Sequence, residues 1–242
     1  MKQAILAVHF GTNYPNGRAA MNSMDEAMKA VASEADFFSV TSKGLESGLS
    51  VVKKEGYTHI VVQSTYLLDG VKYRELEADT AKWRPNFTQF LLSPPLLSST
   101  ADLKHLADGL DQLYRPKNDE ILVLVGHGTS CFSNVVYPAL QGIFHTMGRD
   151  DIVIGTVEGF PNLQDVLNYL SRCQYTRLHL VPLMMTAGKH AYDDIAGEKN
   201  SWKSRLKQAG CDVRCTMQGL SELPQAQEIV VEHLMKVMRT IK

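Results

Sequence analysis

The heptapeptide LAVHFGT at residues 6–12 returns as VLVGHGT at residues 123–129, an offset of 117 residues. Two further matches lie at an offset of 118 residues: residues 57–62 with 175–180, and Gly70 with Gly188. Separate places that agree on nearly one offset indicate a duplicated unit. The alternative is that any two α/β halves share the same order of strands, loops and helices.

Each half alternates short β-rich runs with amphipathic helical stretches, which predicts an α/β fold with two four-stranded parallel sheets flanked by helices. The expected strands are residues 3–9, 37–41, 59–64, 88–92, 121–125, 152–157, 178–182 and 212–216. The expected helices are residues 18–35, 45–55, 71–83, 101–113, 132–147, 163–172, 191–208 and 225–241.

A polar connector at residues 115–119 separates the two halves. We therefore expect an N-terminal unit at residues 1–117 and a C-terminal unit at residues 118–242, with the final helix free to pack on the first unit. Ligands of open parallel sheets bind beyond the carboxyl ends of the strands. With two such sheets, the cleft between the halves is the expected binding site.

Composition excludes several classes of protein. The 242 residues include 25 Lys and Arg against 26 Asp and Glu, a formal net charge of −1, which disfavours a nucleic-acid or anionic-membrane partner. The apolar run from Ala4 to Val8 is far too short for a signal-peptide core or a membrane span, so a cytoplasmic protein is expected. Four irregularly placed cysteines do not form a disulfide scaffold.

Three strand ends of the second half each carry a side chain that can bind a metal. His127 and Glu158 each lie within a glycine-flanked turn, and His190 follows Gly188-Lys189. Successive units of a parallel sheet bring such ends side by side. Two imidazoles and a carboxylate suit a mid-to-late first-row divalent metal and leave positions open for a substrate.

The first half lacks this ligand set and serves as an internal control. Phe10 stands opposite His127, residues 41–43 stand opposite Glu158, and Lys72 stands opposite His190. One metal site per chain is therefore expected. Taken singly, a histidine after a strand is usually an ordinary loop residue. His9, at the end of the first strand, is a further candidate for facing the cleft.

Other chemistries leave weaker signals in the chain. The loop at residues 11–17 lacks the Lys-Ser/Thr pair of a phosphate-binding loop, and neither a G-x-G-x-x-G turn after a strand nor a G-x-S-x-G elbow is present. From the residues alone, a metal-dependent hydrolase also fits a His2Glu set. The chain shows no further acidic bridging set that would favour it.

At these positions the sequence resembles a known family. The resemblance is carried by FGT at 10–12, PPLLSS at 94–99, GHG at 126–128, VEGFP at 157–161, VPLM at 181–184, AGKHAYDD at 187–194 and SWK at 201–203. These motifs, in this order and spacing, are similar to those of the class II tetrapyrrole metal chelatases, most closely the anaerobic sirohydrochlorin cobalt chelatases of the CbiK type. The resemblance covers nearly the whole chain.

This resemblance implies two pseudo-symmetric Rossmann-like lobes with a tetrapyrrole cleft between them, and insertion of Co²⁺ into sirohydrochlorin or its reduced precorrin-2 form in cobalamin biosynthesis. The family's metal-binding His, Glu and His fall on His127, Glu158 and His190. The metal is a substrate, and no organic cofactor is expected. Between Thr41 and Tyr57 the first half looks shorter than in better-known members, so we expect a reduced segment at the rim of the cleft.

In this interpretation His127 binds the incoming ion and also accepts pyrrole protons, while Glu158 relays them to solvent. The candidate substrate contacts are Phe10, Gly11, Thr12, Asn13, Tyr14, Tyr66, Leu67, Gly128 and Met184. For the apolar members of this set, packing in the core is an equal alternative. Backbone N–H groups at residues 11–13 and 128–130, with Lys43, Lys72, Arg74 and Lys189, are candidates for holding substrate carboxylates.

Three alternatives stay open at this point. A ferrochelatase or a nickel chelatase acting on a related tetrapyrrole would use the same ligands, because affinity order does not choose between Fe²⁺, Co²⁺ and Ni²⁺. A non-catalytic carrier would bind the tetrapyrrole or the metal with the same residues and would not turn it over. The sequence is compatible with a homo-oligomer.

Overall fold

Two four-stranded, all-parallel sheets form the framework of the protein. The computed structural model describes residues 2–117, 119–173 and 177–241. The first sheet has the order β2-β1-β3-β4, and the second has the equivalent order β6-β5-β7-β8. The strands are β1 (Gln3–His9), β2 (Asp36–Thr41), β3 (His59–Ser64), β4 (Gln89–Leu92), β5 (Glu120–Gly126), β6 (Ile152–Thr156), β7 (Arg177–Leu183) and β8 (Asp212–Cys215).

The identical strand order confirms the predicted fold class of two similar α/β halves. In each sheet the first strand of the half lies at the centre and pairs with the second and third strands. Ala4 of β1, for example, pairs with Asp36 and Ile60, and Leu122 of β5 pairs with Ile152 and His179. Of the predicted segments, Asn118 in the connector and Tyr175-Thr176 in the repeat lie outside the described residues.

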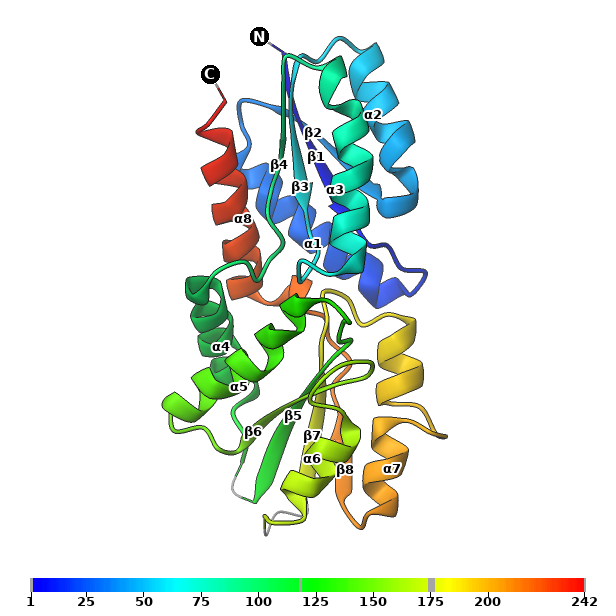
Figure 1. Cartoon of the computed structure of the whole chain (residues 1–242), viewed down its shortest axis with the longest axis vertical. Helices are drawn as coiled ribbons and strands as arrows, with labels where there is room; N and C mark the ends of the chain where they lie inside the picture. Colours follow the sequence, from blue (N-terminus) through cyan, green and yellow to red (C-terminus); the bar gives the residue numbers. More distant parts are fainter. Residues whose placement is uncertain (1, 118, 174–176, 242) are drawn as a thin grey trace.

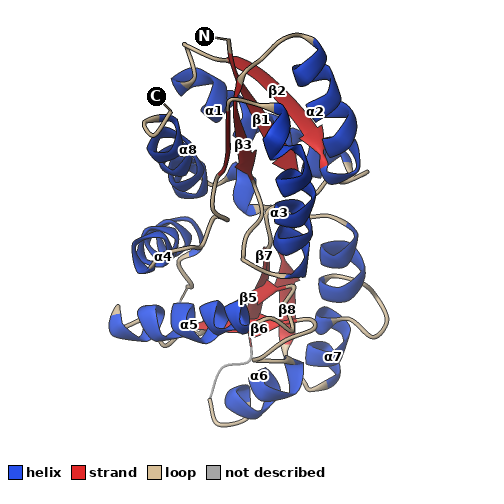
Figure 2. Ribbon diagram, turned by 45° about the horizontal axis from the view of Figure 1, so that its top comes forward, coloured by secondary structure: helices blue, strands red, loops and turns tan. Residues whose placement is uncertain are grey.

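The central strands are continuous aliphatic runs because helices cover both faces of each sheet (Figure 2). The helices are α1 (Pro15–Val31), α2 (Leu45–Lys54), α3 (Val71–Trp83), α4 (Thr100–Tyr114), α5 (Val136–Thr146), α6 (Leu163–Leu170), α7 (Trp202–Gln208) and α8 (Pro224–Met238). Residues Ala4 to Val8 of β1 are fully buried, as are Ile121 to Val125 of β5.

The two halves exchange their last helices. Helix α4 belongs to the first half of the sequence, yet it packs beside α5 of the second half. Helix α8, at the end of the chain, packs against α1 and β3 of the first half and also meets α4 (Figure 1). We call the first sheet with α1, α2, α3 and α8 the first lobe, and the second sheet with α4, α5, α6 and α7 the second lobe.

One buried apolar cluster therefore draws on both lobes. It includes Ile5, Met24, Leu106, Leu124, Phe144 and Leu234, all fully buried. Two further clusters belong to single lobes: one lies on the outer face of the first sheet and contains Leu6 and Leu49, and one lies on the outer face of the second sheet and contains Val123 and Trp202. The lobes are thus joined by packed side chains as well as by the connector.

The predicted helix over residues 191–208 is wrong. The chain forms a π-helical turn at Ala191–Ile195, leaves the helical path, and starts α7 only at Trp202. Asn200 adopts a left-handed backbone (φ 53°), and Ser201 caps α7 by accepting a hydrogen bond from the Ser204 N–H at 3.0 Å. A capping residue with extended backbone at that point ends any continuous helix.

Helix α1 also differs from its predicted range of residues 18–35. It begins at Pro15, because proline is favoured in the first turn of a helix, and it ends at Val31.

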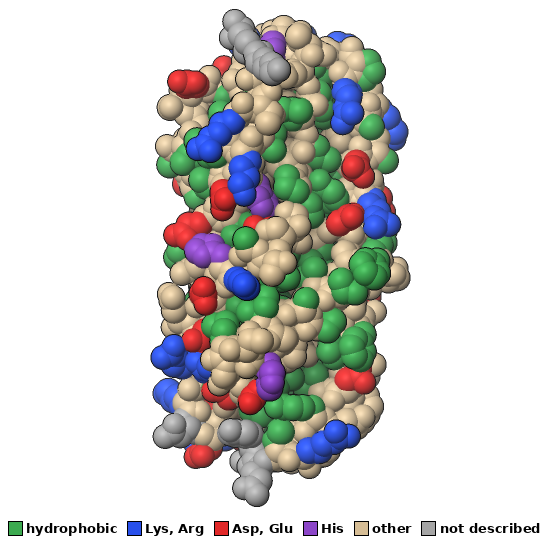
Figure 3. All heavy atoms as spheres, turned by 60° about the vertical axis from the view of Figure 1, so that its left-hand side comes forward, with side chains coloured by type: hydrophobic (Ala, Val, Ile, Leu, Met, Phe, Trp, Pro, Cys, Tyr) green, Lys and Arg blue, Asp and Glu red, His purple; other side chains and the backbone are tan. Residues whose placement is uncertain are grey.

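Charged side chains of both signs are interspersed over the face that carries α4, α5 and α8 (Figure 3). This distribution fits the formal net charge of −1. In the described part of the chain, none of the helices has the length and apolar character required to cross a bilayer.

Candidate active site

His127 and His190 come together at the carboxyl ends of neighbouring strands. His127 follows β5 directly, and His190 lies in the segment between β7 and the π-helical turn Ala191–Ile195. Their ring centroids are 4.6 Å apart, and their planes are nearly perpendicular at 85°. The strands β5 and β7 are hydrogen-bonded neighbours, so the sheet itself sets this proximity.

Glu158 lies beside His127 on the turn after β6. Its Oε2 is 3.8 Å from Nδ1 of His127. Backbone hydrogen bonds tie this turn to the His127 turn: Val157 N–H donates to Gly126 O at 2.9 Å, and Glu158 N–H donates to His127 O at 2.8 Å. These backbone hydrogen bonds fix the turn of Glu158 relative to the turn of His127.

Gly128 is required for this close approach of the two turns. It has φ +86°, and a Cβ placed on it would lie 2.5 Å from the backbone nitrogen of Gly159. Both the left-handed backbone and the available space select glycine here.

Hydrogen bonds at Nδ1 orient both imidazoles. His190 Nδ1 lies 2.8 Å from Oδ2 of Asp194, and His127 Nδ1 lies 3.3 Å from the carbonyl oxygen of Gly128. A carboxylate and a carbonyl only accept hydrogen bonds, so Nδ1 carries the proton in each ring. The Nε2 lone pairs are left for an incoming ion or proton.

The ligand set is open rather than closed around an ion. The side chains of His127, Glu158 and His190 are 39%, 62% and 52% exposed. Within residues 2–117, 119–173 and 177–241, no three His, Cys, Asp or Glu side chains are already arranged to hold a metal. The structure thus brings His127 and His190 into contact and leaves Glu158 on the Nδ1 side of His127.

Loops of the first lobe meet this site from the opposite side. A Cβ on Gly188, just before His190, would lie 3.4 Å from Oγ1 of Thr12. The equivalent contact of the other half pairs Gly70 with Oγ1 of Thr129, also at 3.4 Å. Each lobe therefore inserts its Gly-Thr turn against a glycine of the other, as expected for a duplicated unit with pseudo-twofold symmetry.

A family model described as cobalt chelatase (CbiK) matches residues 3–239. The chain belongs to the CbiK cobalt chelatase family. It is 30% identical to a sirohydrochlorin cobaltochelatase of Salmonella typhimurium, over 97% of this chain and 96% of that protein. It is also 30% identical to the sirohydrochlorin cobaltochelatase CbiKC of Nitratidesulfovibrio vulgaris, over 96% of this chain and 89% of that protein.

Solved structures of other chelatases share the fold. SirB from Bacillus subtilis with Fe³⁺ aligns with a TM-score of 0.72 at 19% identity, covering 98% of this chain and 96% of SirB. CbiX, described as the terminal enzyme for siroheme biosynthesis in denitrifying bacteria, aligns with a TM-score of 0.61 at 17% identity, covering 98% of this chain and 99% of CbiX. The two-lobe arrangement expected for the family is confirmed.

The expected apolar substrate contacts differ in how far they are exposed. Phe10 is 55% exposed just after β1. Its ring centroid lies 6.2 Å from that of the buried Tyr66, and the two rings are nearly perpendicular at 85°. Leu67 packs against the apolar cluster shared by the two lobes, and Met184 packs against that of the second sheet.

The prediction that His9 faces the cleft is wrong. His9 is only 3% exposed, and its Nε2 lies 2.8 Å from Oδ1 of Asp25, while its Nδ1 lies 3.0 Å from Oγ1 of Thr65. The ring is therefore used inside the first lobe.

Two backbone donors expected to receive carboxylates are already engaged. Gly128 N–H donates to the hydroxyl of Tyr137 at 3.2 Å, and Thr129 N–H donates to Oδ1 of Asn134 at 3.1 Å. A substrate carboxylate at this turn must therefore find other donors.

Sequence reasoning missed three aromatic residues on the turns around the site. Phe132 and Phe160 are 83% and 58% exposed, which is unusual for phenylalanine, and Asn134 links their turns by donating to Phe160 O at 2.8 Å. Tyr192, two residues after His190, stacks on Tyr14. The only signal for Tyr192 in the sequence was its place in the AGKHAYDD motif.

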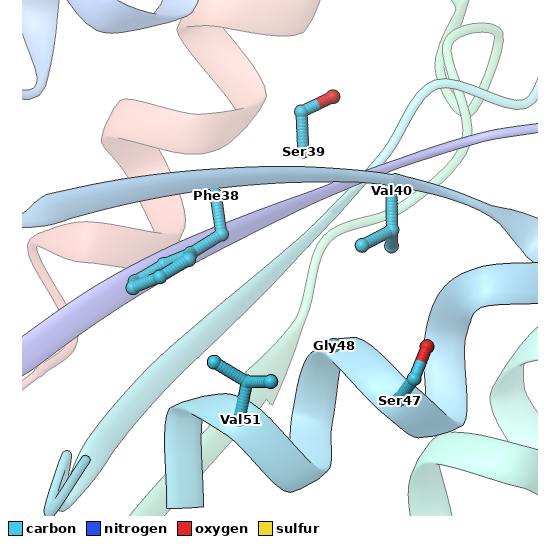
Figure 4. A pocket seen from close by; sticks show the side chains of 6 residues that line it. All are labelled: Phe38, Ser39, Val40, Ser47, Gly48 and Val51. Carbon is cyan, nitrogen blue, oxygen red and sulfur yellow. The ribbon is translucent and has the colours of Figure 1, made fainter.

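The two described surface hollows are not part of this site. One lies between β2 and α2 and is lined by Phe38, Val40 and Val51 with small polar residues (Figure 4). The other lies between α3 and β4. Neither includes His127, Glu158 or His190.

Proposed function

We propose that this protein inserts Co²⁺ into sirohydrochlorin, or into its reduced precorrin-2 form, with His127, Glu158 and His190 as the metal-handling residues. The observation that carries the proposal is the perpendicular His127–His190 pair at 4.6 Å, with Glu158 at 3.8 Å from His127. Membership of the cobalt chelatase family and the similarity to two sirohydrochlorin cobaltochelatases support it.

Metal insertion requires two tasks of the protein. The ion must exchange water for protein ligands and then for the four macrocycle nitrogens, and two pyrrole N–H protons must leave. Neutral imidazole performs either task near neutral pH, because its reference pKa is about 6.5. The free Nε2 atoms of His127 and His190 are the entry ligands for the ion, since Nδ1 of each ring is engaged.

Glu158 is placed to take a proton from His127. After the ion passes to the macrocycle, His127 Nε2 accepts a pyrrole proton, and the proton on Nδ1 leaves to the nearby Glu158 carboxylate. The ring is then neutral with its proton on Nε2. Proton exchange with water must return that proton to Nδ1 before Nε2 can accept the second pyrrole proton. The Glu158 side chain is 62% exposed and can release the proton to water. To act as a third ligand as well, Glu158 must swing toward the Nε2 side.

Contacts with the macrocycle are assigned to the turns around the histidine pair. Phe10, Tyr14 and Tyr66 supply the apolar wall from the first lobe, and the backbone of residues 11–13 supplies donors. Lys189 adjoins His190 and is exposed, which suits a substrate carboxylate. Lys72 and Arg74 already pair with Glu75 and Asp69, so their contribution requires those exposed pairs to open.

A direct assay tests the proposal. Purified protein, sirohydrochlorin and Co²⁺ are mixed, and the absorbance change on metal insertion is followed for the wild type, His127→Ala, His190→Ala and Glu158→Gln. We expect rates reduced by at least about 100-fold for both histidine variants, because each loses a ligand or the proton acceptor. His145→Ala, an exposed histidine on α5 paired with Asp150, is the matched control.

Two outcomes would contradict the proposal. Wild-type rates in both His127→Ala and His190→Ala would remove these residues from the site. Failure of a catalytic amount of wild type to metallate many equivalents of tetrapyrrole would favour the carrier alternative. Repeating the assay with Fe²⁺ and Ni²⁺ compares the three metals directly.

A further inference from the structure

The segment that carries His190 is fastened to the first lobe by a pair of stacked rings. Tyr14 directly precedes α1 in the first lobe, and Tyr192 lies in the π-helical turn Ala191–Ile195 of the second. Their ring centroids are 4.9 Å apart and their planes differ by 5°. Asn16 of α1 adds a long hydrogen bond, with Nδ2 donating to the Tyr192 hydroxyl at 3.5 Å.

This contact acts on a short element that the second sheet supports from its inner side. The turn has five residues, of which Ala191 and Ile195 are buried against the second sheet. Single π-helical turns are uncommon and are found frequently at functional sites. The outer side of this turn is held by the Tyr14 ring and, just before it, by the close approach of Thr12 to Gly188.

His190 depends on the same turn for its position. Its side chain is half exposed, and its ring contacts are Nδ1 to Asp194 at 2.8 Å and the His127 ring. Tyr192 lies two residues after His190, and Asp194 lies two residues after Tyr192. A ring that fixes Tyr192 therefore fixes the backbone on both sides of it, including both members of the His190–Asp194 pair.

We propose that Tyr192 and Tyr14 are positioning residues that hold His190 opposite His127, so that a side chain of the first lobe completes the metal-binding arrangement of the second. This inference rests on the proposed function for the identity of the ion. Neither tyrosine needs to touch the ion. The stack acts through His190 and through the orientation that Asp194 imposes on its ring.

Binding of Co²⁺ alone to the full-length protein, measured by calorimetry, tests the inference without the tetrapyrrole. Tyr192→Leu keeps apolar volume but removes the stacking interaction. We therefore expect this variant to bind Co²⁺ about 3- to 10-fold more weakly than wild type. Tyr14→Leu should lose a similar factor. The double variant should be no weaker than either single variant, because both remove one interaction. Tyr192→Phe, which keeps the stack, should stay within about 2-fold of wild type.

Tyr169→Leu is the matched control, since Tyr169 is an exposed tyrosine on α6 that hydrogen-bonds to Asp150 O. Melting temperatures measured on the same samples identify any variant that fails to fold. If Tyr192→Leu fails to fold, the Co²⁺ affinities of Tyr192→Phe and Tyr14→Leu are compared instead. Wild-type affinity in Tyr192→Leu, or losses that add in the double variant, would overturn the inference.

The failure of this inference and that of the proposed function are distinguishable. Wild type that binds Co²⁺ but does not metallate sirohydrochlorin overturns the function, while the affinities still judge the stack. Wild type that metallates, with Tyr192→Leu binding Co²⁺ equally well, overturns the stack alone. Wild type that binds no Co²⁺ overturns both.

Discussion

Gly128 and Gly56 share a left-handed backbone, with φ +86° and +81°, but their surroundings differ. A Cβ on Gly56 would meet nothing within 4 Å, whereas a Cβ on Gly128 would meet the backbone of Gly159 at 2.5 Å. Gly56 serves only its own turn. Gly128 also allows the turn carrying His127 to approach the turn carrying Glu158.

This pair of glycines separates backbone strain from site geometry. Gly56→Ala should cost roughly 1 kcal/mol of unfolding free energy, from the left-handed backbone alone. Gly128→Ala adds a clash with main chain that cannot rotate away, and we expect a total cost of roughly 2–5 kcal/mol. Urea denaturation measures both values. Gly128→Ala should also slow Co²⁺ insertion strongly while Gly56→Ala does not; equal costs and equal rates would show that the two turns do not depend on this contact.

His179 predicts how stability depends on pH. The residue is 3% exposed in β7, and its Nε2 lies 2.8 Å from Oγ1 of Thr216. Its buried Nδ1 has no hydrogen-bond partner among residues 2–117, 119–173 and 177–241. Burial, together with the nearby Arg214 guanidinium, lowers the pKa of His179 to about 4. The unfolded chain binds this proton more readily, so the stability is complete above pH 6.5 and falls as the pH drops from 6.5 toward about 4.

The expected loss from this residue is about 3 kcal/mol across that window. His179→Gln can keep the hydrogen bond to Thr216 but cannot titrate. Urea midpoints measured from pH 4 to 8 should therefore fall less steeply for this variant than for wild type, whatever its absolute stability. His145→Gln, at an exposed position, should follow the wild-type slope. Parallel slopes for His179→Gln and wild type would show that His179 is not the titrating group.

At the scale of elements, the eight strands were predictable within about two residues. The inner strands β1, β3, β5 and β7 are apolar runs buried on both faces, and turn residues bound the edge strands. The positions of His127, Glu158 and His190 at strand ends followed from the same pattern. The break after Ile195 did not follow, since it depends on the backbone of Asn200 and on a cap at Ser201. The Tyr14–Tyr192 stack could not be predicted either, because the local sequence does not show which rings of distant turns come into contact.

Ser201 tests the start of α7. It is fully buried, accepts from Ser204 N–H at 3.0 Å, and its hydroxyl donates to the carbonyl of Gly197. Ser201→Ala removes both bonds and should cost about 1–2 kcal/mol. Ser171→Ala, where an exposed hydroxyl near the end of α6 donates to Asn168 O, is the control and should change the urea midpoint little. Equal effects at the two positions would mean that the cap does not define this helix.

At the scale of the whole molecule, the exchange of α4 and α8 makes the lobes physically dependent on each other. The proposed division at residues 117 and 118 follows the sequence repeat, yet α4 lies before that division and packs with the second lobe. Helix α8 contributes Ile229, Val230 and Leu234 to the apolar cluster that the lobes share. Separating the halves at the connector would expose this cluster on both sides. We therefore expect the lobes to unfold together.

The two tryptophans report on this coupling, because each belongs to one lobe. Trp83 packs on the cluster of the first sheet, and Trp202 is 4% exposed within the cluster of the second. In Trp202→Phe the fluorescence follows the first lobe, and in Trp83→Phe it follows the second. Each variant should show a fluorescence midpoint in urea that coincides with its own circular-dichroism midpoint, since the shared cluster cannot be half lost without exposing apolar surface in both lobes. A fluorescence transition that precedes the loss of helix in either variant would show that its lobe unfolds alone, and that the shared cluster couples the lobes too weakly to make them one cooperative unit.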